Sequence, residues 1–385
     1  MNVPSPPSSG PLAGLRVVEL AGIGPGPFAA MLLADLGADV VRVDRPDARP
    51  LLGPSETDLL NRGRRSVAVD LKRPEGVAAV LDLVRSADVL VEGFRPGVAE
   101  RLGLGPEECS AANPRLVYGR MTGWGQDGPL ARSAGHDIGY IAITGALHAI
   151  GRRGDPPQIP LNLVGDFAGG SMYLLVGILS ALWESRSSGR GQVVDAAIVD
   201  GTTHLSTMVL GMMRTGLWRD ERGVNLLDSG APYYDVYETS DGRHMAVGPL
   251  EEEFYGEMVR LLGLQDAPDR FEHAETEHLR TLLAKTFRTR TQADWTEVFE
   301  GTDACVAPVL SYGEAPGHPH LAARGTYVQH DGVTQPAPAP RFSRTGARLG
   351  RPPARLGEHT REVLEEWGVA DVAGLLASGA AVQAD

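Results

Sequence analysis

The first half of the chain alternates short apolar runs with helical patterns. Five runs rich in Val, Leu and Ala have the length of buried strands. They lie at 15–20, 38–43, 66–69, 87–91 and 116–121. Helical periodicity follows the first and third of these runs, at 28–36 and 74–86. This alternation predicts an α/β fold with a Rossmann-like, doubly wound parallel sheet.

The second half follows different patterns. Residues 166–213 are helical in pattern, apart from a break at 187–191. Residues 232–247 alternate aromatic and β-branched with polar positions around Asp241-Gly242. That alternation predicts a β-hairpin with a two-residue turn, which opens a smaller α+β unit.

The patterns together predict the domain organisation. The C-terminal part has a Pro-rich stretch at 318–340, expected to be extended, and a helix at 360–367. The expected segments are a large Rossmann-like domain over 1–200, a helical linker over 201–225, a small α+β domain over 226–315, and a linker returning to the large domain over 316–385.

Charge narrows the classes of partner. The 385 residues include 36 Lys and Arg against 49 Asp and Glu, a formal net charge of −13. Nucleic acids and anionic membranes attract basic surfaces, so neither partner is expected. Cys109 and Cys305 are the only cysteines in the sequence. Because two cysteines make neither a disulfide scaffold nor a cysteine metal site, we expect a reducing, cytoplasmic location and no metal.

One apolar run needs a separate interpretation. Residues 167–183 carry no charge and approach the length of a membrane span. Glycines interrupt the run, and Asp166 and Glu184 flank it directly. These features predict a buried core helix rather than a membrane-spanning one.

A glycine-rich turn follows the first predicted strand. The segment Gly24-Pro25-Gly26-Pro27-Phe28-Ala29 fits the dinucleotide pattern G-x-G-x-x-A. A pyrophosphate at such a turn is held by backbone N–H groups, and Pro25 and Pro27 have none. We therefore do not expect NAD to bind here.

A basic cluster follows the second predicted strand. The segment from Arg42 to Arg73 contains eight basic residues and five acidic ones. An excess of arginine near the ends of parallel strands favours a phosphorylated ligand, although a solvated loop explains any single residue equally well. The eight are Arg42, Arg45, Arg49, Arg62, Arg64, Arg65, Lys72 and Arg73.

Two titratable residues lie among small residues. His136 follows Gly135, after the glycine-rich loop 122–129, and Asp166 begins the segment DFAGG before the long apolar run. A lone histidine is usually structural, and an aspartate at a helix start is usually an N-cap. The neighbouring glycines favour the functional interpretation, because they let a substrate approach closely.

Long segments of the chain resemble the alpha-methylacyl-CoA racemases, which belong to the family III CoA-transferase (CaiB/BaiF-type) superfamily. The resemblance extends from about Pro11 to Thr345. The segments that carry it are PLAGLRVVELAGIGPGPFAAMLLADLGADVVRVDRP, NRGRRSVAVDLK, VEGFRPGVAERLGLGPEE, MTGWGQDGP, AGHDIGY and LNLVGDFAGGSM.

The resemblance implies roles for individual residues. His136 and Asp166 match the two acid–base residues, and Glu251, in GPLEEEFY, matches the glutamate that orients the histidine. CoA is part of the substrate, no separate cofactor is expected, and two chains are expected to form an interlocked homodimer. The positions that match CoA-binding residues are Arg45, Val69, Asp70, Leu71, Lys72, Gly93, Phe94, Arg95, Arg101, Gly135, Asp137, Ile138, Gly139 and Tyr140.

The implied reaction is a 1,1-proton transfer that interconverts (2R)- and (2S)-2-methylacyl-CoA thioesters through an enolate. A backbone N–H at the helix start near Asp166 is the expected donor to the enolate oxygen. The same helix start favours an ionised Asp166, whereas burial by Phe167 and Met172 favours a protonated one.

The resemblance leaves a second activity open. CoA-transferases of the superfamily use the aspartate at position 166 as a nucleophile that forms mixed anhydrides. They generally lack the histidine and carry a mobile glycine-rich loop where this chain has 249–253, so both features favour the racemase. A CoA-binding protein without activity is disfavoured by the joint presence of His136, Asp166 and Glu251.

The acyl chain of the substrate is not specified by the sequence. Apolar residues expected to line its channel are Ile23, Leu161, Leu163 and Met212. Branched fatty acyl and sterol side-chain thioesters both remain open.

Overall fold

The structure is a computed structural model that describes residues 10–49 and 53–384, and its contacts divide the chain into two units. The larger unit contains the chain up to Thr144, residues 161–205 and the chain from Ala323 onward. The smaller unit contains residues 145–160 and 206–322. This grouping differs from the expected segments, because 145–160 joins the smaller unit and the expected linker 201–225 divides after Leu205.

A seven-stranded sheet forms the centre of the larger unit. Its strands are β1 (Arg16–Leu20), β2 (Asp39–Asp44), β3 (Arg65–Val69), β4 (Val89–Glu92), β5 (Val117–Thr122), β6 (Val193–Ala197) and β12 (Ala381–Val382). Their order is β12-β3-β2-β1-β4-β5-β6, and β1 to β6 are parallel. The order 3-2-1-4-5-6 confirms the Rossmann-like prediction. The sheet is not wholly parallel, however, since β12 pairs antiparallel with β3.

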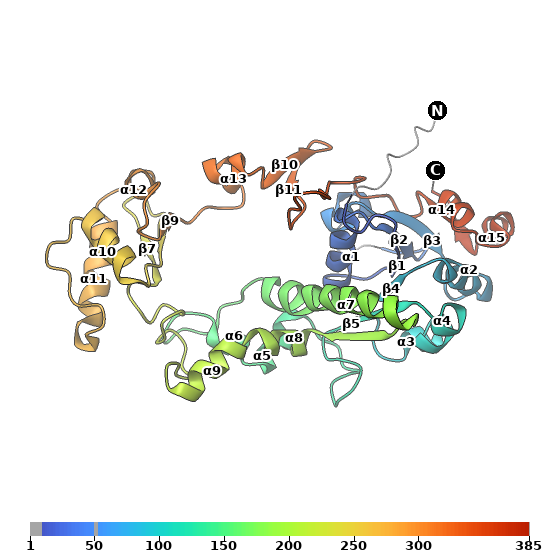
Figure 1. The fold of residues 1–385 in the computed structure, drawn as a ribbon, viewed down its shortest axis with the longest axis horizontal. Coiled ribbons are helices and arrows are strands. Elements are labelled where there is room, and N and C mark those ends of the chain that lie inside the picture. Colours follow the sequence, from blue (N-terminus) through green and yellow to red (C-terminus); the bar gives the residue numbers. More distant parts are fainter. Residues whose placement is uncertain (1–9, 50–52, 385) are drawn as a thin grey trace. The chain divides into compact units, whose positions relative to one another are not determined.

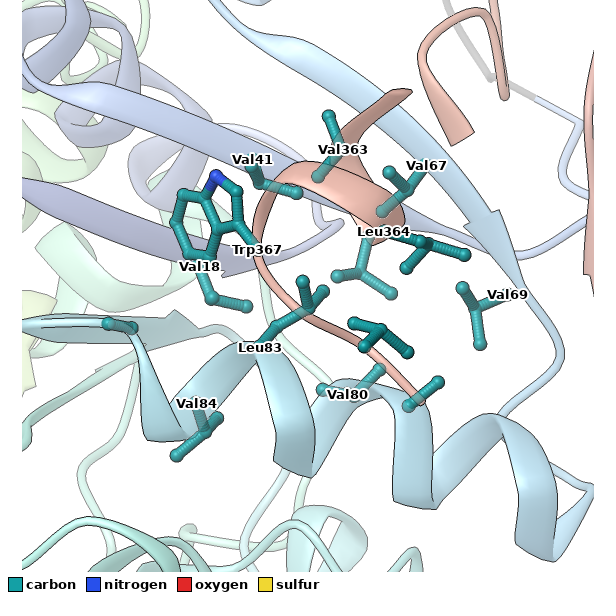
Figure 2. Packing of buried hydrophobic residues seen from close by; sticks show 14 of the residues in the cluster. Val18, Val41, Val67, Val69, Val80, Leu83, Val84, Val363, Leu364 and Trp367 are labelled. Carbon is teal, nitrogen blue, oxygen red and sulfur yellow. The ribbon is translucent and has the colours of Figure 1, made fainter. Parts of the chain in front are cut away.

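Helices cover both faces of this sheet (Figure 1). Neighbouring strand residues point to opposite faces, so that Val18 packs in one apolar cluster and Val17 in the other. Figure 2 shows the first cluster, in which Val363, Leu364 and Trp367 from the C-terminal part pack over strand valines and Leu83. The C-terminal helices therefore complete the core of the larger unit.

The helices of the larger unit follow the expected α/β alternation. They are α1 (Pro25–Asp35), α2 (Pro74–Arg85), α3 (Val98–Arg101), α4 (Pro106–Ala112), α5 (Asp137–Ile143), η3 (Leu163–Ser171), α7 (Met172–Ser188), α8 (Ile198–Leu205), α14 (Thr360–Glu366) and α15 (Val372–Ser378), with the short turns η1 (Ser55–Thr57) and η2 (Leu59–Asn61). The helix α1 starts at Pro25, where a proline needs no hydrogen-bond partner for its nitrogen.

The stretch 166–213 is not uniformly helical. The strand β6 follows the predicted break and pairs with β5, which corrects the sequence interpretation. Within the described part of the chain, residues 163–188 form one helical run that is long and apolar enough to cross a membrane by length and composition alone. Leu174, Leu175 and Ile178 of this run are buried in the core, as predicted for a core helix.

The smaller unit has its own sheet and core. Its strands are β7 (Asp235–Glu238), β8 (His244–Val247) and β9 (Val306–Pro308), and its helices are α6 (Ala146–Ala149), α9 (Thr207–Thr215), α10 (Glu252–Leu261), α11 (Thr276–Phe287) and α12 (Gln292–Phe299), with the turns η4 (His273–Glu275) and η5 (Ala315–Gly317). The strands are antiparallel in the order β7-β8-β9. Phe287, Trp295 and Met258 lie in the core between strands and helices.

The predicted hairpin is present with a different turn. Thr239 donates its N–H to the carbonyl of Arg243, so three residues form the loop instead of two. Gly242 adopts φ 74° at the end of this loop, a conformation that glycine permits without strain.

The Pro-rich stretch after His318 is also more structured than predicted. It contains the short helix α13 (Pro319–Ala323) and the antiparallel strands β10 (Tyr327–His330) and β11 (Val333–Pro336). Gln335 of β11 is buried and accepts a hydrogen bond from Arg62 at 2.9 Å. This contact fixes the segment to the larger unit.

Candidate active site

A cavity of about 820 Å³ lies at the carboxyl ends of β1 to β4 in the larger unit. Its lining residues directly follow the strands: 21–24 after β1, 45–49 after β2, 70–72 after β3, and Phe94 after β4. The strand order reverses between β1 and β4, and open α/β sheets bind ligands at such a switch point. The volume is within the range of small-molecule sites.

The basic cluster does not form a single patch of free charges. Arg42, Arg45, Arg49 and Lys72 line the cavity. Four arginines, Arg42 among them, are buried and paired with carboxylates, so the prediction of one phosphate-binding patch is wrong for these four. These pairs are Arg42 with Asp44, Arg62 with Asp35, Arg64 with Glu19, and Arg65 with Asp39 and Glu366.

The expected CoA-binding positions lie at different depths. Arg45, Asp70, Leu71, Lys72 and Phe94 line the cavity. Exposed residues beside it are Gly93 and Arg95, which flank Phe94, and Arg101 at the end of α3. Val69 is fully buried in the core, so its side chain does not reach the cavity.

Asp166 lies on the cavity wall within η3, a π-helical segment that continues into α7. π-Helical turns are rare and are frequent at functional sites. Buried Ser171 fixes this segment, because its hydroxyl donates to the carbonyls of Pro25 at 2.8 Å and Asp166 at 3.0 Å. Gly24, with φ 74°, leaves room for the carboxylate, since a Cβ at that position would lie 3.1 Å from Asp166 Oδ2.

Two side chains hold Asp166 from other directions. Asn162 donates to Asp166 Oδ2 at 3.3 Å, and the N–H of Asp166 donates to Asp137 Oδ1 at 2.7 Å. The N–H of Asp166 is therefore occupied by Asp137, and the donation of another backbone N–H at this helix start to an enolate oxygen stays a prediction. Asp137 fixes the backbone that carries the Asp166 carboxylate.

Burial has the largest effect on the pKa of Asp166. Loss of solvent is the largest influence and raises the pKa of this carboxyl, while the hydrogen bond from Asn162 lowers it. The charge of Asp137 raises the same pKa, and a charge on His136 lowers it. Phe167 contributes to the apolar surroundings by stacking on Phe28, with ring centroids 4.4 Å apart. Met172 contributes less, since it is 45% exposed.

His136 lies near Asp166 but outside the cavity lining. It is exposed in extended backbone at the N-cap of α5, and it is close enough to Asp166 to influence its pKa. Gly135, Ile138 and Gly139 surround it in sequence. Tyr140 packs edge-on against Trp124 at 4.7 Å.

The pKa of Tyr140, four residues after His136, depends on charged residues in other segments. Burial raises the pKa of Tyr140, the charge of Asp166 raises it further, and Arg95 lowers it. Tyr140 therefore lies within electrostatic reach of both the Asp166 carboxylate and the Arg95 guanidinium.

Glu251 belongs to the smaller unit, where it is exposed at the N-cap of α10. Among the described residues, its carboxylate makes no capping hydrogen bond to that helix. Glu252 and Glu253 follow in the first turn. The side chain of Glu251 is thus available to a group outside its own helix.

Sequence reasoning missed three parts of the site. Asn162 precedes Asp166 by four residues and gave no signal of its own. In the sequence, Gly24 indicates only a dinucleotide pattern, although in the structure it adjoins the Asp166 carboxylate. Gly379 lines the cavity because the C-terminal strand pairs with β3, which no local pattern predicts. Of the expected acyl-channel residues, Ile23 lines the cavity and Met212 lies in α9 of the smaller unit.

Comparison with known proteins agrees with this architecture. Residues 12–360 match the family described as CoA-transferase family III. The chain is 47% identical over 363 residues to the alpha-methylacyl-CoA racemase of Mus musculus, with 93% of each chain covered. It is 45% identical over 362 residues to the racemase of the same name from Homo sapiens, again with 93% of each covered.

A solved structure shows the same fold. The crystal structure of a CAIB/BAIF family protein from Brucella suis superposes with a TM-score of 0.81 and 28% sequence identity, covering 93% of this chain and 100% of that one. The extent of these matches leaves one conclusion about the family. The chain belongs to family III of the CoA-transferases.

Proposed function

We propose that this protein is an isomerase of the alpha-methylacyl-CoA racemase type, which interconverts (2R)- and (2S)-2-methylacyl-CoA thioesters. The observation that carries the proposal is the pair of His136 and Asp166, which lie close enough for a charge on His136 to lower the pKa of Asp166, and of which Asp166 lines the cavity at the carboxyl ends of the strands. Two relatives that carry the racemase name match nearly the whole chain.

The chemistry requires two groups with opposite protonation. The α-hydrogen of a thioester is acidic because the resulting enolate spreads its charge onto the thioester oxygen. A base removes this proton from one face, and a protonated acid delivers another proton to the opposite face. His136 and Asp166 take these roles in turn, so each turnover exchanges their protonation states. Each positioned group of this kind contributes about 10²–10⁴-fold to the rate.

The surroundings of Asp166 suit such an exchange. An ordinary aspartate is ionised at neutral pH and gives up a proton too readily to act as an efficient acid. Burial raises the pKa of Asp166, and a protonated His136 lowers it again. A proton on His136 therefore favours the ionised carboxylate of Asp166.

The remaining expected site residues have supporting roles in this proposal. Arg45 and Lys72 line the cavity and bind CoA phosphates, since guanidinium and ammonium groups recognise phosphate oxygens. Arg95 and Arg101 add positive charge beside Phe94. Glu251 orients His136, as the resemblance implies. CoA enters as part of the substrate, and no other cofactor takes part.

Measurement of α-hydrogen exchange for each epimer separately tests the two-base proposal. In D₂O, His136→Ala should abolish inversion while one epimer still exchanges its α-hydrogen with retention, and Asp166→Ala should show the mirror pattern. Glu251→Gln should be milder, by about ten- to a hundredfold, because it disturbs the histidine without removing it. Near-normal inversion in His136→Ala would contradict the proposal.

A second assay separates the racemase from a CoA-transferase. A transferase would form a mixed anhydride at Asp166, which hydroxylamine converts to an aspartyl hydroxamate. The racemase should give no modified Asp166 during turnover and should not move CoA to free carboxylic acids. A hydroxamate at 166 together with CoA transfer as fast as α-hydrogen exchange would refute the racemase assignment.

We also infer that two copies of the chain associate as the interlocked homodimer. The support is an apolar stripe on α7, where Met172, Val176, Leu179 and Trp183 are 45%, 62%, 39% and 73% exposed. Their spacing places them on one helix face, and contiguous exposed apolar surfaces of this kind usually bind a partner.

Light scattering of the purified protein should give the mass of two chains. Because interlocked chains cannot separate while folded, two differently tagged dimers should form no hybrid on mixing, and should form one after joint unfolding and refolding. A monomer that binds lipid vesicles would instead assign the stripe to a membrane.

A further inference from the structure

A buried arginine in the smaller unit holds the backbone on both sides of Glu251. Arg270 is 8% exposed, and one of its guanidinium nitrogens, Nη1, donates to the carbonyls of Pro249 at 3.2 Å and Glu251 at 3.4 Å. The other, Nη2, donates to Glu252 Oε2 at 3.1 Å. One planar group thereby joins residues 249, 251 and 252 of the turn that leads into α10.

Aromatic rings fix the position of this guanidinium. Its central carbon lies 5.1 Å from the ring centre of Tyr233 and 4.6 Å from the ring centres of Tyr255 and Phe271. Cations within about 6 Å of aromatic rings are attracted to them. Three aromatic rings therefore hold the Arg270 guanidinium in place, independently of its hydrogen bonds to residues 249–252.

The charge balance shows that this arrangement does more than pair two ions. The side chain of Arg270 is 4% exposed, whereas that of Glu252, its carboxylate partner, is 78% exposed. Burying a charge with an exposed partner is unfavourable unless other contacts compensate. Here the compensation comes from the backbone carbonyls of Pro249 and Glu251, so Arg270 restrains the geometry of that turn.

We propose that Arg270 is a positioning residue that sets the direction of the Glu251 carboxylate by fixing the backbone of residues 249–252. The inference rests on the proposed function, in which Glu251 orients His136. Because Glu251 lies at the N-cap, a rotation of its backbone would redirect the whole side chain. A planar guanidinium restrains that rotation, and the point charge of lysine does so less well.

The test compares α-hydrogen exchange of the two epimers in Arg270→Gln, Glu251→Gln and the double variant. Arg270→Gln should lower exchange on the face served by His136 by about tenfold and leave exchange on the Asp166 face within about twofold. Arg270→Lys should lie between Arg270→Gln and the unchanged protein. The double variant should be no slower than Glu251→Gln alone, because both changes act through the same carboxylate.

Arg280 provides a matched control in the same unit. It also bonds a carboxylate, of Asp235, and the backbone carbonyls of Ser229 and Gly230, but it does not contact residues 249–252. Arg280→Gln should lower the denaturation midpoint without making one epimer exchange more slowly than the other. Amide hydrogen exchange at residues 250–255 should rise in Arg270→Gln and stay unchanged in Arg280→Gln.

The contrary outcomes are distinct. Equal losses on both faces in Arg270→Gln, or additive losses in the double variant, would overturn the positioning role. An unchanged Glu251→Gln would overturn it as well. Failure of the proposed function itself would appear separately, as an unaltered protein that exchanges no α-hydrogen.

Discussion

Removal of one partner of the buried pair of Glu19 and Arg64 should strongly destabilise the fold, although Arg64 belongs to the cluster that the sequence assigned to phosphate binding. Glu19 lies on β1, and both side chains are 1% exposed. Arg64 donates to Glu19, to the carbonyl of Leu60, and to Asn61 Oδ1 at 2.8 Å. Burial lowers the pKa of Arg64 and the charge of Glu19 raises it. Removal of Glu19 therefore leaves a positive charge buried without its carboxylate.

The size of the effect follows from the burial. Loss of one partner of a fully buried ion pair typically lowers the free energy of unfolding by about 3–5 kcal/mol. Total stabilities are about 5–15 kcal/mol, so either Glu19→Leu or Arg64→Met removes a large part of the total. At about 2–4 °C per kcal/mol for a unit of this size, the melting temperature should fall by about 6–20 °C.

Urea unfolding followed by circular dichroism measures this loss, with the double variant Glu19→Leu/Arg64→Met as the decisive comparison. Replacement of a whole buried pair by apolar residues is often neutral or stabilising, so the double variant should recover most of the stability. Arg45→Ala is the control, because the Arg45 side chain is 66% exposed and should leave the midpoint unchanged. Single variants that lose less than about 1 kcal/mol, the value of an exposed pair, would refute the reasoning, as would losses that add in the double variant.

Three further predictions concern the site. Arg45→Ala or Arg95→Ala should raise KM for the acyl-CoA with a smaller change in kcat, since phosphate contacts bind ground and transition states alike; a fall in kcat at constant KM would contradict this. Gly24→Ala should lower stability by about 1–2 kcal/mol and kcat by about tenfold or more, because the new methyl would meet the Asp166 carboxylate at 3.1 Å in a left-handed backbone. Gly26→Ala should do neither, because within the described part of the chain the added methyl would meet nothing within 4 Å beyond the neighbouring backbone of α1. Asp166→Asn should abolish inversion yet raise the denaturation midpoint at pH 7, because burial raises the pKa of the carboxyl and so makes its ionised form unfavourable in the folded protein. This gain in stability should vanish as the pH falls to 3.8, the ordinary pKa of the carboxyl. A gain in stability that does not depend on pH would exclude this cause.

The sequence by itself determined the parts of the fold that depend on local patterns. Short apolar runs predicted β1 to β5, because buried parallel strands need continuous apolar residues. Helical periodicity predicted α2, and the motifs around His136 and Asp166 identified the family and its acid–base candidates. The residues that define each of these features lie close together along the chain, so the pattern is present in the sequence itself.

Long-range contacts decided the rest. The strand β6 becomes visible through its pairing with β5, and β12 through its antiparallel pairing with β3. Gly379 enters the cavity for the same reason. A strand of two residues has no periodicity, and its place depends on which edge of the sheet is free.

Burial likewise separated residues that look the same in the sequence. Arg64 and Arg45 belong to one basic cluster. Arg64 is buried in an ion pair with Glu19, whereas Arg45 lines the cavity. For Asp166 the sequence predicted two opposing effects on the pKa: a helix start lowers it, and apolar neighbours raise it. The tertiary structure decided in favour of burial, which raises the pKa of the carboxyl, because desolvation depends on every segment packed around a group and no local motif encodes it.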